Sequence, residues 1–146
     1  MTTREPAKIL LAEDNYSDVL LLKVSLEKSN FPCELSVAAN GEIASKMLKQ
    51  EGDYAATPKP DIIILDINMP LKTGHQLLEE IKKDDRLKKI PVIMLTGSKT
   101  SQDVDAAYSN HASGYIVKPM QLGEYGDIID AIERYWFSTV SLPPAA

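Results

Sequence analysis

Five short apolar segments alternate with segments of helical spacing, and this alternation constrains the fold more than any other feature of the sequence. Strand–helix alternation predicts a parallel sheet, because parallel strands need a long crossover connection between them. With right-handed crossovers, we expect one α/β domain with a doubly wound five-stranded parallel sheet of strand order 2-1-3-4-5. The expected strands are KILLA (Lys8–Ala12), ELSVA (Glu34–Ala38), IIILD (Ile62–Asp66), PVIML (Pro91–Leu95) and GYIV (Gly114–Val117).

Length and charge exclude several classes of protein. The 146 residues, 44% of them hydrophobic, suffice for one domain with a proper core. The net charge of −5 and the absence of a basic run argue against nucleic acid as a partner. The chain starts without an apolar signal core, and no apolar segment approaches the roughly 20 residues that a membrane helix needs. We therefore expect a cytoplasmic protein with no membrane partner.

Asp66 directly follows the unbroken apolar run Ile62–Leu65, although a carboxylate is costly to bury. In open parallel sheets ligands bind in the crevice beyond the carboxyl ends of the strands, so this position indicates chemistry. The alternative is that the carboxylate only caps the next turn. The loops after the first, third, fourth and fifth strands should converge on that crevice. Their polar residues are Glu13, Asp14, Asp66, Asn68, Thr96 and Lys118.

The three acids predict a metal site. Crowded carboxylates repel one another, so Glu13, Asp14 and Asp66 indicate a hard divalent cation, for which Mg²⁺ is the natural candidate. A carboxylate nucleophile, Mg²⁺, a lysine and a threonine hydroxyl suit phosphoryl transfer to Asp66. The sequence has no G-x-x-x-x-G-K-[ST] motif, so we expect the donor to be a phosphoprotein or a small acyl phosphate or amidophosphate.

Four segments carry a resemblance to a known family: LLAEDN, IIILDINMP, MLTGS and GYIVKP. They resemble the signature segments of receiver domains of two-component response regulators, which have a flavodoxin-like receiver fold. Thr96 lies 30 residues after Asp66 (96 − 66) and Lys118 lies 52 after it (118 − 66), and both spacings are typical of that family. The resemblance implies that Asp66 is the phosphoacceptor, that Thr96 and Lys118 bind phosphoryl oxygens, and that the donor is a sensor histidine kinase.

The same resemblance implies roles for the neighbouring residues. Asp14 would bind Mg²⁺ directly, Glu13 through water, and Asn68 through its backbone carbonyl. Pro119 would follow a cis peptide bond that places the lysine. Tyr115 would be the switch residue, which rotates inward when phosphorylation draws the threonine toward the phosphoryl group.

Two other classes of protein remain as alternatives. An aspartate-nucleophile phosphatase of the haloacid dehalogenase kind also places Asp after an apolar strand, but its D-x-D-x-T motif needs a second acid where Asn68 stands. A phosphorylation-independent pseudo-receiver commonly lacks one of the acids, the threonine or the lysine, and this chain has all of them. Its departures from the family pattern are mild: Glu13 in place of Asp, and the small Gly97 after the threonine.

A finer resemblance concerns the insertion Glu51–Pro60 and the last residues. They are similar to small response regulators that partner cyanobacterial phytochromes, which implies a phytochrome-type kinase and a homodimer that involves the last helix and tail. We assign residues 1–137 to the receiver domain and 138–146 to a short tail, with no effector domain. The apolar residues near this end favour a partner surface, and the alternative is that they cover the protein's own core. They are Trp136, Phe137, Val140 and Leu142.

Cysteine and histidine carry no predicted chemistry. Cys33 stands alone between apolar neighbours, which is typical of a packed thiol. His75 and His111 have no Cys or His at ligand spacing, so each is expected to be solvated or packed.

Overall fold

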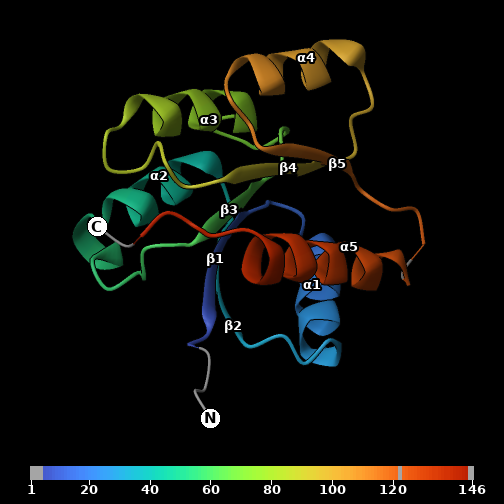
Figure 1. Ribbon diagram of the computed structural model, residues 1–146. Helices are drawn as coiled ribbons and strands as arrows, with labels where there is room; N and C mark the ends of the chain where they lie inside the picture. The colour runs from blue at the N-terminus through green and yellow to red at the C-terminus, as the bar shows by residue number, and fades with distance from the viewer. Residues whose placement is uncertain (1–4, 122, 145–146) are drawn as a thin grey trace.

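The computed structural model describes residues 5–121 and 123–144, which form a three-layer α/β sandwich around one parallel sheet (Figure 1). The strand order is β2-β1-β3-β4-β5, so the predicted fold class and order are confirmed, and each predicted strand end lies within one residue of the observed one. Residues 1–4 and 145–146, predicted to begin the domain and to end the tail, lie outside the described residues. The strands are β1 (Ala7–Ala12), β2 (Cys33–Ala38), β3 (Ile62–Leu65), β4 (Val92–Thr96) and β5 (Gly114–Val117).

Helices cover both faces of the sheet, with α2, α3 and α4 on one side and α1 and α5 on the other (Figure 1). Neighbouring residues of a strand point to opposite faces, so the apolar run Ile62–Leu65 supplies both cores at once. The helices are α1 (Tyr16–Lys28), α2 (Gly41–Lys49), α3 (Gly74–Lys83), α4 (Ser101–Ser109) and α5 (Glu124–Ile132), with a 3₁₀ turn η1 (Gly52–Tyr54) and a π-helix η2 (Glu133–Thr139).

Polar caps fix where the helices begin after their strands. The side chain of Asn15 accepts a hydrogen bond from the backbone of Asp18 at the start of α1. Thr73 and Gln76 form a reciprocal capping box at the start of α3, and Thr100 caps α4. Such a cap contributes about 1 kcal/mol, and it leaves only a short loop between strand end and helix. Side chains of these loops are therefore held close to the carboxyl ends of the strands.

The loop between β3 and α3 contains a tight turn with a positive φ. Leu71 has a φ of 71°, and the backbone N–H of Lys72 donates to the carbonyl of Pro70 at 2.8 Å. This three-residue turn is rare and strained for a residue with a side chain. It exposes 75% of the Leu71 side chain beside the carboxyl end of β3.

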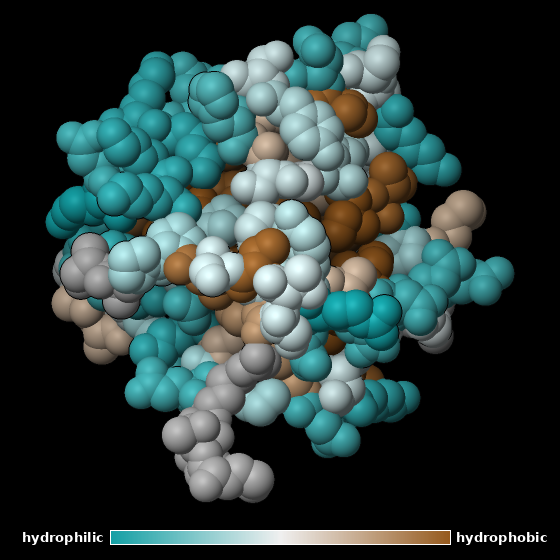
Figure 2. All heavy atoms as spheres, viewed as in Figure 1, coloured by the Kyte–Doolittle hydropathy of each residue, from teal (hydrophilic) through white to brown (hydrophobic). Residues whose placement is uncertain are grey.

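The two edges of the sheet are less covered than its centre. Every residue of β3 and β4 is buried, whereas every residue of β5 is only partly buried. Figure 2 shows hydrophobic atoms among hydrophilic ones on the face where Figure 1 places α5 and the β5 edge. On the opposite edge strand, Cys33 packs partly buried against the core, and burial raises the pKa of its thiol, which agrees with a packed cysteine.

The segment after α5 folds back on the domain. The rings of Phe31 and Phe137 lie 5.2 Å apart, and Trp136 and Leu142 pack against the same core. Trp136, Phe137 and Leu142 contact the protein's own core and remain partly exposed, so the structure supports the covering role, and the partner surface that the sequence favoured stays a prediction. Tyr135 differs, because it is 52% exposed and contacts the ring of Trp136 edge-on. No helix in the described part of the chain is long and apolar enough to cross a membrane.

Candidate phosphoacceptor site

The carboxyl ends of β1, β3, β4 and β5 bring the predicted site residues together. Glu13 follows β1, Asp66 follows β3, Thr96 ends β4 and Lys118 follows β5. Glu13, Asp66 and Thr96 are the polar residues buried at this end of the sheet, with 3%, 6% and 0% of their surface exposed. Burial of this kind needs partners for each polar group.

Lys118 is the cation that pairs the buried acids. Its Nζ lies 2.6 Å from Glu13 Oε1 and 3.1 Å from Asp66 Oδ2, and it also lies 2.8 Å from Asp18 Oδ2 on α1. One ammonium with three N–H donors thus faces three carboxylates. The tyrosine hydroxyl of Tyr125 on α5 donates to the other oxygen of Asp18 at 3.4 Å.

Burial and pairing push the pKa values of the two buried acids apart. Burial raises the pKa of Glu13 to about 7, with a further rise from the adjacent Asp66, although Lys118 acts in the opposite direction. Burial also acts to raise the pKa of Asp66, but hydrogen bonds with Glu13, Thr96 and Lys118 outweigh it and hold that pKa below its usual range. Asp66 is therefore the ionised member of the pair and has the charge that a nucleophile needs.

Three carboxylates fit a divalent cation. Oxygen atoms of Glu13, Asp14 and Asp66 lie within 4.8 Å of one another, and Asp14 is exposed to solvent while the other two are buried. Carboxylate oxygens are the ligands that hard cations prefer, and an open side leaves room for the waters that Mg²⁺ retains. Asn68 is exposed in the loop after β3, and its role as a ligand through its carbonyl stays a prediction.

Backbone contacts fix the position of Asp66. Its N–H donates to the carbonyl of Ala12 at 3.0 Å, and the N–H of Gly74 donates to the carbonyl of Ile67 at 2.8 Å. A Cβ on Gly74 would lie 2.2 Å from the carbonyl oxygen of Asp66, so only glycine permits this approach. The first turn of α3 is thereby packed directly against the chain that carries the nucleophile.

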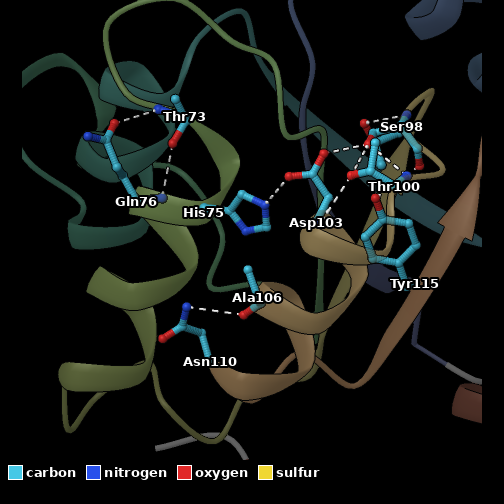
Figure 3. Close-up of polar contacts among 10 residues, drawn as sticks. Thr73, His75, Gln76, Ser98, Thr100, Asp103, Ala106, Asn110 and Tyr115 are labelled. Carbon is cyan, nitrogen blue, oxygen red and sulfur yellow. Dashed lines mark hydrogen bonds and ion pairs between the residues drawn. The ribbon is translucent and has the colours of Figure 1, made fainter.

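Tyr115 on β5 points toward the loop that follows Thr96 (Figure 3). Its hydroxyl donates to the carbonyl of Ser98 at 3.0 Å, and the N–H of Ser98 lies 3.4 Å from the Thr96 hydroxyl. The two residues predicted to form the switch are thus connected through one loop residue. The hydroxyl of Ser98 also donates to Asp103 on α4.

His75 on α3 faces Asp103 on α4 and links the two helices (Figure 3). Its Nε2 lies 3.0 Å from Asp103 Oδ1, and its Nδ1 is buried without a hydrogen-bond partner among the described residues. Hydrogen bonds from Ser98 and His75 lower the pKa of Asp103. The histidine is partly packed, as the sequence predicted, and it makes a hydrogen bond with Asp103 that the sequence did not indicate.

The peptide bond before Pro119 is trans, as is every peptide bond between described residues, so the predicted cis bond is wrong. Trans is the default for a bond before proline by about 0.5–1 kcal/mol. The lysine reaches both buried acids without leaving that default, and its backbone N–H donates to the carbonyl of Thr96 at 2.8 Å.

Three residues of the site were missed in the sequence. Asp18 contacts both Tyr125 and Lys118. It was missed because acids are common in the first turn of a helix, where they interact favourably with the helix dipole. Gly74 was the third. Its signal was a glycine at the start of an amphipathic helix, where the helix approaches a strand end.

The fold and this arrangement define a class of protein: an α/β domain with a buried aspartate at the carboxyl end of its third strand, served by two further acids, a threonine and a lysine. Residues 9–130 match the model of the response regulator receiver domain. The chain belongs to the response regulator receiver family.

Similar proteins cover nearly the whole chain. The response regulator Rcp1 of Synechocystis sp. is 39% identical over 96% of this chain and 95% of its own. The phosphorylated cyanobacterial phytochrome response regulator RcpA is 40% identical with a TM-score of 0.90, over 95% of this chain and 99% of that one. The Mn²⁺-bound form of Rcp1 is 39% identical with a TM-score of 0.87, over 95% of this chain and 100% of that one. The chain is thus a receiver-domain response regulator related to phytochrome-associated regulators.

Proposed function

We propose that the chain is a signalling switch that accepts a phosphoryl group on Asp66 from a histidine kinase. The observation that carries this proposal is the ionised, buried Asp66 carboxylate, 3.1 Å from Lys118 and beside the acids Glu13 and Asp14. A carboxylate held in this way is a nucleophile without a general base. The phosphorylated form reported for RcpA supports the proposal by similarity.

In the proposed reaction, an Asp66 carboxylate oxygen attacks the phosphorus of a phosphohistidine or a small acyl phosphate. A P–O bond to Asp66 forms, and the P–N or P–O bond to the donor breaks with its electron pair on the leaving group. Lys118 and the Thr96 hydroxyl stabilise negative charge on the phosphoryl oxygens. Mg²⁺, held by Glu13 through water, Asp14, Asp66 and the carbonyl of Asn68, would supply further positive charge.

The product is an acyl phosphate that water later hydrolyses, so the protein catalyses its own phosphorylation and dephosphorylation and does not act as a conventional enzyme. We propose that Thr96 and Tyr115 form the switch. The contacts that support this are those of Ser98, which connects the Thr96 hydroxyl to the Tyr115 hydroxyl and to Asp103 on α4. A shift of Thr96 toward a phosphoryl oxygen would change the position of these residues and so the face formed by α4, β5 and α5.

We propose a phytochrome-type kinase as the partner, because both Rcp1 and RcpA are similar along nearly the whole chain and RcpA is a phytochrome response regulator. We assign residues 1–137 to the receiver domain and the following residues to a short tail that packs on it. We propose that the signal is passed on by contact with other proteins. Self-association through the partly covered β5 edge and exposed Tyr135 is the form of contact that we propose for the homodimer.

The test is incubation with Mg²⁺ and acetyl phosphate, followed by intact-mass measurement and by the fluorescence of the single tryptophan, Trp136. We expect the mass of one phosphoryl group, lost on acid or hydroxylamine treatment, and a change in fluorescence. A protein that gains no mass from acetyl phosphate or from a phosphorylated histidine kinase would be a phosphorylation-independent module instead.

A further inference from the structure

Asp18 is a fourth acid of the site that belongs to neither the phosphoacceptor nor the metal cluster. It lies in the first turn of α1, and its Oδ2 is 2.8 Å from Lys118 Nζ. Its Oδ1 accepts a hydrogen bond of 3.4 Å from Tyr125, which is 3% exposed on α5. The carboxylate therefore connects the lysine after β5 to two helices on one face of the sheet.

Lys118 shares its charge among three carboxylates: Glu13 at 2.6 Å, Asp18 at 2.8 Å and Asp66 at 3.1 Å. Of these, Asp66 is the most distant in the unphosphorylated protein. A phosphoryl group on Asp66 would add negative charge and three acceptor oxygens where the ammonium already lies. The three N–H donors already serve Glu13, Asp18 and Asp66, so a second hydrogen bond to the phosphoryl oxygens must be taken from another acid. Asp18 is the acid that can give it up, because 25% of its side chain is exposed to water against 2% for Glu13.

We propose that Asp18 is a positioning residue that holds Lys118 in the unphosphorylated protein and releases it when Asp66 carries a phosphoryl group. This inference rests on the phosphoryl acceptance proposed above. The strength of the pair between Asp18 and Lys118 then sets how tightly the site binds a phosphoryl group. Once Asp18 has lost Lys118, its carboxylate can move and change its hydrogen bond with Tyr125 on α5. Phosphorylation of Asp66 would thus affect α5 by a route separate from Thr96 and Tyr115.

The test is a titration of the full chain with beryllofluoride, a phosphoryl mimic, in the presence of Mg²⁺, followed by calorimetry and Trp136 fluorescence. Asp18→Asn removes the competing charge and should tighten beryllofluoride binding roughly threefold to tenfold, the range expected for one partly buried ion pair. Tyr125→Phe keeps the charge but loses the hydroxyl that holds Asp18, and it should act in the same direction more weakly. Glu27→Gln, which removes an exposed acid at the far end of α1, should leave the affinity unchanged.

A Lys118→Ala background separates the pair from a general effect of charge. There, Asp18→Asn should no longer alter the affinity, because the lysine that links it to the site is gone. Unchanged or weaker binding by Asp18→Asn beside a normal wild-type response would overturn the role of Asp18 alone. An equal gain in the Lys118→Ala background would overturn it too. A wild-type protein that binds no beryllofluoride would instead overturn the phosphoryl acceptance on which the inference rests.

Discussion

Gly74 packs against the backbone of Asp66 so closely that a methyl group on its α-carbon would lie 2.2 Å from the Asp66 carbonyl oxygen. We expect Gly74→Ala to lower the free energy of unfolding by about 1–3 kcal/mol, because the clash is with backbone and cannot be relieved by a side-chain rotation. Phosphorylation by acetyl phosphate should slow as well, since Asp66 is displaced. Urea unfolding and labelling measure the two effects. Gly126→Ala is the matched control: its Cβ meets open space within α5, so it should leave stability unchanged or slightly raised.

Asp66→Asn should abolish phosphorylation and leave the fold intact. The amide has nearly the shape of the carboxylate but cannot attack phosphorus as an anion. Stability should change little, because Lys118 keeps its contacts with Glu13 and Asp18. Mass spectrometry after acetyl phosphate treatment and circular dichroism check the two parts. Acid-labile label at wild-type level in this variant would show that another residue is the acceptor.

Lys118→Ala should make the stability of the domain depend on Mg²⁺. The lysine is the shared partner of Glu13, Asp18 and Asp66, so its loss leaves crowded acids without a cation. We expect the free energy of unfolding to fall by roughly 1–3 kcal/mol in the absence of Mg²⁺. Mg²⁺ should then stabilise the variant more than it stabilises the wild type. Thermal unfolding with Mg²⁺ and with chelator measures this. The variant should still accept a phosphoryl group but show a weaker Trp136 response, and a full response would contradict the role of the lysine.

Mg²⁺ affinity should rise with pH between about 6 and 8. The pKa of Glu13 is about 7, so its carboxyl is half protonated near neutrality, and binding of a cation must displace that proton. The same raised pKa makes the stability of the metal-free protein depend on pH in the opposite direction. Its folded state holds the proton more tightly than the unfolded state, whose pKa is near 4.5, so stability should fall as the pH rises from 4.5 through 7. Asp66, with a lowered pKa, stays ionised in this window and adds no slope.

Calorimetric titration with Mg²⁺ at several pH values, in buffers of different ionisation enthalpy, counts the protons released. Glu13→Gln is the control, because the amide has no proton to release and should give an affinity that varies much less with pH. An equal pH dependence in both proteins would assign the proton to another group.

Tyr135 should mediate self-association in preference to the residues that follow it. It is 52% exposed, whereas Phe137 packs against Phe31 of the same chain. We expect a homodimer at micromolar concentration that Tyr135→Ser weakens about tenfold, which corresponds to roughly 1.4 kcal/mol. Sedimentation with and without acetyl phosphate and Mg²⁺ measures it. Tyr54→Ser, a partly buried tyrosine in η1, provides a control for the general loss of a ring. A monomer at every concentration would return this end of the chain to a purely covering role.

Much of the fold was readable from the sequence because central parallel strands need unbroken apolar runs. Ile62–Leu65 is such a run, and it coincides with the observed strand; the expected strand was one residue longer, because it included Asp66. The convergence of the acids, Thr96 and Lys118 was also readable, since each lies at or after the carboxyl end of a strand that had to face the same crevice. Their roles stay predictions.

Other features depend on contacts between distant segments, which no local pattern encodes. Asp18 and Lys118 are 100 residues apart, and their pairing follows from how α1 and β5 are placed by the whole sheet. The resemblance misled at Pro119, where local preference for a trans bond holds. The apolar end of the chain favoured a partner surface over a cover for its own core, and the packing of Phe137 on Phe31 supports the cover through a contact that the sequence could not show.

The course of the tail has a practical consequence for engineering. Pro143 and Pro144 line a cavity of about 330 Å³ at the amino ends of β3 and β4 (Figure 1). Its other lining residues are Lys59, Pro60, Asp61, Asp85, Arg86, Lys89 and Ile90. Asp66 and Thr96 lie at the other ends of those strands. A fluorescent reporter or a surface tether joined after the tail would therefore start at the pole opposite the acids. It would leave the approach of a kinase to Asp66 open, so this end suits the attachment of cargo to a functional switch.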